Sequence, residues 1–314
     1  MLGFLVRRLA LAVPTLILAS MLIFALQQLL PGDVATALTG EERDPEVIAF
    51  IRQKYHLDAP LPVRYGYWAG GVLRGDLGES IRLQKPVSKL IVEKFPVTLE
   101  LACLAMLVAL GIGVPMGVLS AVKRGTAADT IANGVALWGL SVPNFWLGIL
   151  LILLFSVQLG WLPASGYVSP FESIGENLAA MAMPAFVLGN AIAAVMMRHT
   201  RAAMLGVLGQ DYVRTARAKG VGTGRLILRH ALPNAAIPII TLGALEFGQL
   251  LSGAVLTEQV FAVPGFGKLM VDAVFNRDFA TVQGVVICTA ATYIGLNLAA
   301  DVLSAAVNPK LRRA

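Results

Sequence analysis

Long apolar stretches constrain this chain more than any other feature of its sequence. A helix needs about 20 mostly apolar residues to cross a hydrocarbon core of ~30 Å. We place such helices at residues 9–30, 97–121, 132–158, 179–198, 236–257 and 281–304. Only 14% of the residues are charged, against about 25% in soluble domains. The sequence therefore predicts an all-α polytopic membrane protein with about six transmembrane helices.

The first apolar stretch has some features of a secretory signal, because Arg7 and Arg8 precede it. It is too long for that role, and Leu29-Leu30-Pro31-Gly32-Asp33 lacks a small-residue cleavage pattern. We expect residues 1–30 to be a short tail followed by an uncleaved transmembrane helix.

The basic residues that lie close to the spans set their orientation. With the N-terminus in the cytoplasm, only Lys268 and Arg277 fall in the two short outer loops. The inner segments then hold Arg7, Arg8, Lys123, Arg124, Arg198, Arg201, Arg214, Arg217, Lys219, Arg225, Arg229, Lys310, Arg312 and Arg313. We predict that both termini, including the tail at 305–314, are cytoplasmic.

Two segments outside the spans differ in kind. Residues 31–96 form an extracytoplasmic loop, with a helix expected near Asp44–Tyr55 and turns expected around its later glycines. It could cap the outer mouth of the transmembrane core, which spans 97–304, or serve only as a spacer. The turn glycines are Gly70, Gly71, Gly75 and Gly78, and the side chains that could pack a cap are Tyr65, Tyr67, Trp68, Val72 and Leu73.

The inner loop 199–235 is strongly basic and is punctuated by glycine and proline. Helix-forming residues from Asp211 to Lys219 end at Gly220, and Pro233 opens the next span. Asp211 near the start, with Arg217 and Lys219 near the end, suits the helix dipole. We expect a helix-turn-helix knob that projects into the cytoplasm; the alternative is a loop that only retains topology and has no partner.

This loop resembles the EAA loop of permease subunits in bacterial ABC importers. That pattern is Glu-Ala-Ala, three residues, Gly, nine residues, Ile, one residue and Leu-Pro. Arg214, Thr215 and His230 depart from it, whereas four residues match. The matching residues are Ala216, Gly220, Leu232 and Pro233.

The segment Asp-Tyr-Val-Arg-Thr-Ala-Arg-Ala-Lys-Gly resembles the version of this loop in the first permease (dipeptide permease B-like) of the dipeptide, oligopeptide, nickel and glutathione importers. Further motifs in the expected order extend this resemblance over nearly the whole chain. They are Arg7-Arg8-Leu9, Val13-Pro14-Thr15, Leu30-Pro31-Gly32-Asp33, Gly75-Asp76-Leu77-Gly78, Pro96-Val97-Thr98-Leu99-Glu100-Leu101, Pro143-Asn144-Phe145-Trp146, Arg198-His199-Thr200-Arg201, Pro264-Gly265-Phe266-Gly267 and Val307-Asn308-Pro309-Lys310.

The resemblance implies a type I ABC importer permease in the bacterial inner membrane. Its expected partners are a second homologous permease, two cytoplasmic ATPase subunits and an extracytoplasmic substrate-binding protein. ATP and Mg would bind the ATPases, since this chain has no G-x-x-x-x-G-K-[ST] loop and needs no cofactor itself. The knob would be the coupling helix, with Asp211, Tyr212, Arg214, Thr215, Ala216, Arg217, Ala218, Lys219, Gly220, Leu232 and Pro233 as its residues.

Polar residues inside the spans are candidates for the translocation path. Glu246 is the deepest acid, while Glu100 lies near a span end, where a structural role is the competing interpretation. For Glu246 the alternative to a cavity-facing role is a buried, hydrogen-bonded packing role. The candidates are Glu246, Asn190, Asn297 and Glu100.

Other function classes fit less well. The three histidines, His56, His199 and His230, have no metal-ligand spacing and no adjacent nucleophile, so an enzyme is not expected. The basic residues flank apolar spans without an aromatic platform, so nucleic acid is not an expected partner. A secondary transporter would need paired intramembrane charges. A non-transporting interaction protein would tolerate changes at Gly220.

The substrate is less constrained. A peptide amine would need an acidic path, for which Glu246 is a candidate. Free nickel would need histidine or sulfur ligands, which the spans supply poorly. We expect short peptides, with a nickel chelate or glutathione as the alternatives.

Overall fold

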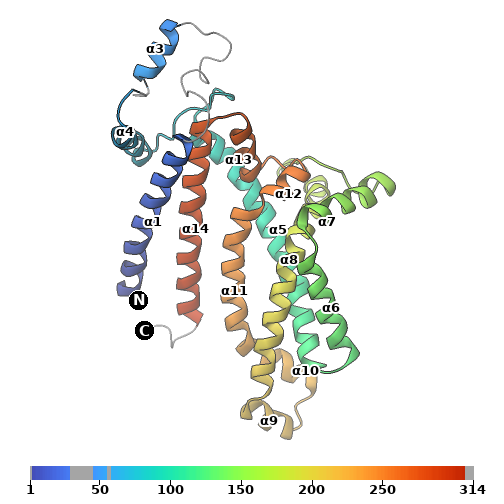
Figure 1. Ribbon diagram of the computed structural model, residues 1–314. Coiled ribbons are helices and arrows are strands. Elements are labelled where there is room, and N and C mark those ends of the chain that lie inside the picture. Colours follow the sequence, from blue (N-terminus) through green and yellow to red (C-terminus); the bar gives the residue numbers. More distant parts are fainter. Residues whose placement is uncertain (1, 29–44, 55–57, 308–314) are drawn as a thin grey trace. The chain divides into compact units, whose positions relative to one another are not determined.

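The computed structural model describes residues 2–28, 45–54 and 58–307. Helices are the only regular secondary structure in these ranges, apart from one isolated β-bridge between Glu79 and Pro86. The all-α prediction is therefore confirmed. The chain divides into two compact units, Met1–Val97 with Gly265–Ile294, and Thr98–Pro264 with Gly295–Ala314 (Figure 1).

Each predicted span overlaps at least one apolar helix. In the described residues, 4 helices are long and apolar enough to cross a membrane, or 5 if one bent pair counts as a single span. The first predicted span is represented by the shorter apolar stretch Ala10–Ala25 of α1 (Leu2–Gln28). The Leu30–Asp33 motif and the tail from residue 308 onward lie outside the described residues.

The first unit contains α1, α3 (Pro45–Lys54), α4 (Leu61–Leu73), the start of α5 (Val87–Val122), α13 (Phe266–Phe275) and the start of α14 (Phe279–Val307). Leu90, Phe266, Leu269 and Val285 form its buried cluster. The Phe95 ring meets the Phe266 ring edge to face at 5.8 Å. The Pro-Gly-Phe-Gly motif thus supplies a core anchor.

The Gly75–Gly78 motif forms a turn against the start of α14. Gly75 and Gly78 have φ of +83° and +84°, which side chains other than hydrogen rarely allow. The Asp76 carboxylate accepts a hydrogen bond from the Gly78 amide at 2.9 Å. A Cβ on Gly78 would lie 3.3 Å from the Ala280 Cβ, so both the turn and the close approach require glycine.

The prediction of turns at Gly70 and Gly71 is wrong, because both lie inside α4. Tertiary contacts override the low helix propensity of glycine here. The Phe24 ring packs on Tyr65 and Trp68 with centroids 5.6 and 5.7 Å away. The start of α5 at Val87 is also earlier than the predicted residue 97.

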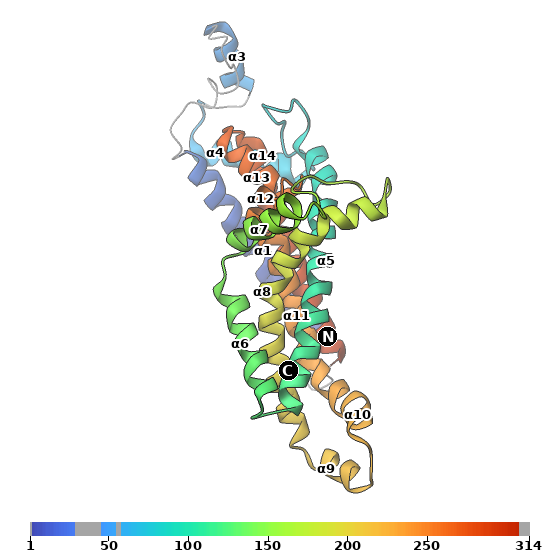
Figure 2. The ribbon, with the colours of Figure 1, turned by 90° about the vertical axis from the view of Figure 1, so that its right-hand side faces the viewer.

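The second unit is built around α8 (Ile174–Leu208), which packs against α6 (Ala127–Ser141) and α11 (Leu232–Gly253) (Figures 1 and 2). Ser173 is the N-cap of α8, and its side chain accepts a hydrogen bond from the Glu176 amide in the first turn. The remaining elements are α7 (Asn144–Leu151), the π-helical turns η1 (Ile152–Gln158) and η2 (Leu226–Ala231), α9 (Asp211–Ala218), α10 (Thr223–Arg225) and α12 (Val255–Val260).

The span predicted at 132–158 is broken. α6 and the helix that follows it meet at an angle of 99°. Val142 and Pro143 lie between them with extended backbones, as expected when proline disfavours helix at the residue before it. Pro143 thus marks a sharp corner, whereas α11 continues through Pro238.

Candidate coupling site and translocation path

The knob lies at one end of the second unit, and α7 and α12 lie at the other end (Figures 1 and 2). It is shorter than the predicted loop 199–235, because α8 continues to Leu208. Arg198 and Arg201 therefore belong to α8 rather than to a loop. We use "knob" for residues 209–222, which consist of α9 and the turns on both sides of it.

One face of α9 holds the helix to the rest of the unit. Val213 is 1% exposed, and Met204 of α8 and Leu226 of η2 are also buried. The helix contacts both α8 and η2. Val213 is the only buried side chain of α9, so the other faces of this helix are mostly uncovered by the part of the chain that the structure describes.

The outward residues of α9 are mostly charged or polar. Asp211, Arg214, Arg217 and Lys219 are exposed, and Tyr212 is 44% exposed. Arg214 pairs with Asp211 at 3.5 Å, but both side chains are solvated, so this pair adds little stability. Thr215 donates to the Asp211 carbonyl at 3.0 Å.

Gly220 ends α9 in the left-handed region, with φ of +79°. The Gly220 amide donates to the Arg217 carbonyl, and the Val221 amide donates to the Ala216 carbonyl. This pair of bonds is the Schellman arrangement, which satisfies the last carbonyls of a helix and suits glycine. Ala216 is half-buried, and Ala218 is exposed.

The second half of the EAA-like pattern begins α11. Leu232 is half-buried, and Pro233 is exposed at the first helical turn, where its missing N–H costs no hydrogen bond. η2 runs directly into α11, so the knob is connected to a long apolar helix on each side.

The four candidate path residues are not joined to one another by any hydrogen bond or ion pair that the described residues show. Glu246 is half-buried midway along α11, and Asn297 is half-buried in α14. Asn190 of α8 lies beside Gly139, and its buried Nδ2 finds no acceptor among the described residues.

Glu100 has a different environment from the other three. Its carboxylate accepts from the Tyr167 hydroxyl at 2.8 Å and from Asn177 Nδ2 at 2.6 Å. Asn177 also donates to the Val168 carbonyl at 2.8 Å, which holds the loop 159–173 on α8. Burial, together with the bond to Glu100, raises the pKa of Tyr167 to about 12, so its hydroxyl remains a donor.

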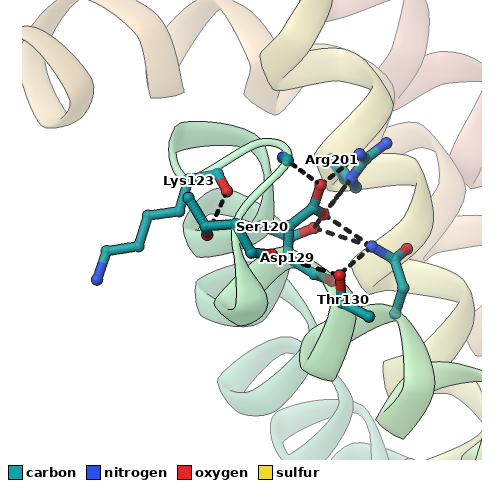
Figure 3. A network of polar contacts seen from close by, with 8 residues as sticks. Ser120, Lys123, Asp129, Thr130 and Arg201 are labelled. Atoms are coloured by element: carbon teal, nitrogen blue, oxygen red, sulfur yellow. Dashed lines mark hydrogen bonds and ion pairs between the residues drawn. The ribbon is translucent and has the colours of Figure 1, made fainter.

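Sequence reasoning missed two buried carboxylates. Glu258 of α12 is fully buried and accepts from the Thr98 hydroxyl at 2.6 Å. Asp129 of α6 pairs with Arg201 of α8 at 3.0 Å (Figure 3). The sequence analysis places Arg201 among the orienting charges and in a family motif but gives it no partner. A lone acid just after the basic turn at Lys123 and Arg124 is the available signal.

The described residues contain no group of three or more His, Cys, Asp or Glu side chains that could hold a metal ion. Cys103 and Cys288 are both free thiols. The functional groups of the described residues are therefore hydrogen-bonding and charged side chains along apolar helices. The helix α9 projects from one end of the second unit.

Comparison with known proteins assigns this architecture. Residues 113–313 match the family described as "Binding-protein-dependent transport system inner membrane component", and residues 1–102 match its N-terminal counterpart. The chain is 42% identical to the dipeptide transport system permease protein DppB of Escherichia coli (strain K12). It is also 42% identical to the glutathione transport system permease protein GsiC of Salmonella typhi. Each alignment covers 99% of both chains.

A solved structure gives the same fold. The inward-facing MetNI methionine ABC transporter matches with a TM-score of 0.56 and 19% identity, over 70% of this chain and 96% of that one. This similarity confirms the predicted ABC importer permease fold.

Proposed function

Because this chain belongs to the family of inner membrane components of binding-protein-dependent transport systems, we propose that it carries short peptides across the bacterial inner membrane. It is a multi-pass permease subunit of an ABC transporter. It is not itself an enzyme and carries no cofactor, since an ATPase partner supplies the energy and a binding protein supplies the substrate.

The peptide substrate is supported by two kinds of observation. The relatives that match over 99% of the chain are named for dipeptide and glutathione transport, and glutathione is itself a small peptide. The described residues offer no cluster that would bind free nickel. Glutathione is the second candidate because GsiC is as similar to this chain as DppB is.

The knob is the proposed docking site for an ATPase. Its support is that α9 is fixed from one side by Val213 and capped by Gly220, while its charged side chains are exposed among the described residues. A rigid, exposed helix between two long helices can pass a movement to both. We further propose two ATPase subunits and a second homologous permease as the assembly.

Glu246 is the proposed first contact for the substrate amine. A carboxylate within an apolar transmembrane helix is costly to bury and is a functional candidate by default. In the described part of the chain, no hydrogen bond or ion pair engages the Glu246 carboxylate. Glu100, by contrast, is engaged by Tyr167 and Asn177.

The test is uptake by the complete transporter in liposomes, with labelled dipeptide, glutathione and nickel, each with and without ATP. Gly220→Trp should abolish uptake because it combines a forbidden backbone angle with bulk on the knob. Gly222→Trp is the matched control, since Gly222 lies in open space with an ordinary negative φ.

ATP-dependent dipeptide uptake that Gly220→Trp removes would support both substrate and docking. Uptake of glutathione or nickel alone under the same conditions would replace the substrate and keep the mechanism. Equal uptake without ATP would contradict the whole assignment.

A further inference from the structure

A buried polar cluster ties three helices together close to the knob (Figure 3). We call Ser120, Asp129, Asn133 and Arg201 the Asp129 cluster. Arg201 donates through Nε and Nη2 to the two Asp129 carboxylate oxygens, each at 3.0 Å. The Gly125 amide, the Ser120 hydroxyl and Asn133 Nδ2 donate to the same carboxylate.

The members come from different helices. Ser120 lies near the end of α5, Asp129 and Asn133 lie in the first turns of α6, and Arg201 lies on α8. The short α5–α6 turn contains Gly125 with φ of +76°, which brings its amide to Asp129. The cluster thus fastens the α5–α6 turn to the side of α8.

The geometry of the cluster resists both sliding and rotation. A guanidinium that meets a carboxylate through two parallel bonds fixes orientation as well as distance, which a lysine cannot do. The Asp129 and Arg201 side chains are only 10% and 27% exposed. Ser120 is fully buried. Removing one charge would leave the other poorly solvated.

The cluster lies on the mechanical route from the knob. Arg201 is seven residues before the end of α8 at Leu208, roughly 10 Å along the axis. α9 follows after a two-residue link and packs back on α8. Above the cluster, Gly117 of α5 leaves so little space that a Cβ would lie 2.6 Å from the Met197 carbonyl. α5 and α8 therefore have no room to shift independently there.

We propose that Asp129 and Arg201 are positioning residues for energy coupling, which make α5, α6 and α8 move as one piece when the ATPase moves α9. This proposal rests on the docking role of α9 given above. The competing interpretation is a staple that stabilises the folded chain and has no part in coupling.

The two interpretations differ in the ratio of ATP hydrolysed to peptide transported. In liposomes that hold the complete transporter, Arg201→Lys and Asp129→Asn should leave hydrolysis per assembled complex close to native. Uptake should fall by about tenfold, because loss of one charge-assisted bond is worth about that factor. The ratio of ATP hydrolysed to peptide transported should therefore rise by about tenfold. A residue that only stabilises the fold would leave this ratio unchanged, because its loss lowers the amount of assembled transporter and so lowers both total rates equally.

Thr98→Val is the matched control. Thr98 is also buried in α5 and also donates to a buried carboxylate, but it lies 22 residues before Ser120, roughly 33 Å along the helix. It should leave the ratio unchanged even if the yield of transporter falls.

A proportional loss of both rates in Arg201→Lys, or an equal rise of the ratio in Thr98→Val, would overturn the proposal. Gly220→Trp, measured beside them, separates the two hypotheses. If Gly220→Trp keeps the native ratio of ATP hydrolysed to peptide transported, the docking role of α9 is wrong. If Gly220→Trp raises this ratio while Arg201→Lys leaves it native, only the role of the Asp129 cluster is wrong.

Discussion

At Gly220 the chain leaves α9 with φ of +79°, and a Cβ at that position would meet no other atom. Strain, rather than a clash, is therefore what a substitution introduces. Gly222 nearby is equally open but has φ of −59°. This pair allows backbone strain to be separated from bulk.

Gly220→Ala should destabilise the end of α9 by about 1–2 kcal/mol, the cost of placing a Cβ in the left-handed region. Gly222→Ala should have almost no effect. Hydrogen exchange of the Gly220 and Val221 amides, which donate to Arg217 and Ala216, would measure this directly. Equal exchange in both variants would show that the cap does not hold α9.

Glu246 and Glu100 provide a second comparison between residues. Glu246→Gln should raise the half-saturating concentration of a dipeptide with a free amine by about tenfold, because a charge-assisted hydrogen bond is lost. A dipeptide acetylated at its amine should be unaffected.

Glu100→Gln should act differently, since its carboxylate holds Tyr167 and Asn177. We expect faster proteolysis of the loop 159–173 and no change in amine preference. If Glu246→Gln treats both dipeptides alike, Glu246 does not contact the substrate amine.

At the scale of elements, the contact between α5 and α8 depends on small residues. A Cβ on Gly113 would lie 2.6 Å from the Ala193 carbonyl, and one on Gly189 would lie 2.6 Å from the Ala105 carbonyl. Backbones that approach this closely are typical of packed membrane helices. Gly111 lies two residues before Gly113, and a Cβ on Gly111 would have no neighbouring atom within 4 Å.

Gly113→Ala should therefore destabilise the chain by roughly 1–3 kcal/mol, as overpacking does elsewhere. Gly111→Ala should be neutral or slightly stabilising, because alanine favours helix. Thermal unfolding of the detergent-solubilised protein, monitored by size-exclusion chromatography, would compare the melting temperatures of the two variants. A similar melting temperature for the two variants would contradict the close packing.

The elements that sequence analysis identified are those with long apolar runs or clear end signals. Gly220 and Pro233 marked the knob because glycine and proline act locally. α4 was missed because the aromatic contacts of Tyr65 and Trp68 with α1 outweigh the glycines, and no local pattern shows such contacts. The size of the 99° corner could not be predicted, because a proline marks where a helix breaks but does not fix the angle.

At the scale of the whole molecule, the family and the fold were accessible from ordered motifs, whereas the buried polar pairs were not. Asp129 and Arg201 are 72 residues apart, and Thr98 and Glu258 are 160 apart. Such pairs form only when distant helices come together, so a single sequence carries no periodic signal for them.

The orientation of the second unit remains a prediction from charge. The knob, α10 and η2 carry Arg214, Arg217, Lys219, Arg225 and Arg229, whereas the loop 159–173 at the opposite end has no lysine or arginine (Figure 2). Short loops rich in basic residues stay in the cytoplasm. The knob should therefore face the cytoplasm, and the loop 159–173 should face outward.

Single cysteines can test this in a background of Cys103→Ala and Cys288→Ala. Phe171→Cys, at a side chain that is 98% exposed, should react with an impermeant maleimide in intact spheroplasts. Arg217→Cys should react only in inverted vesicles, where α9 becomes accessible. Reversed labelling of the two sites would mean that α9 faces away from the cytoplasm, and no cytoplasmic ATPase could then dock on it.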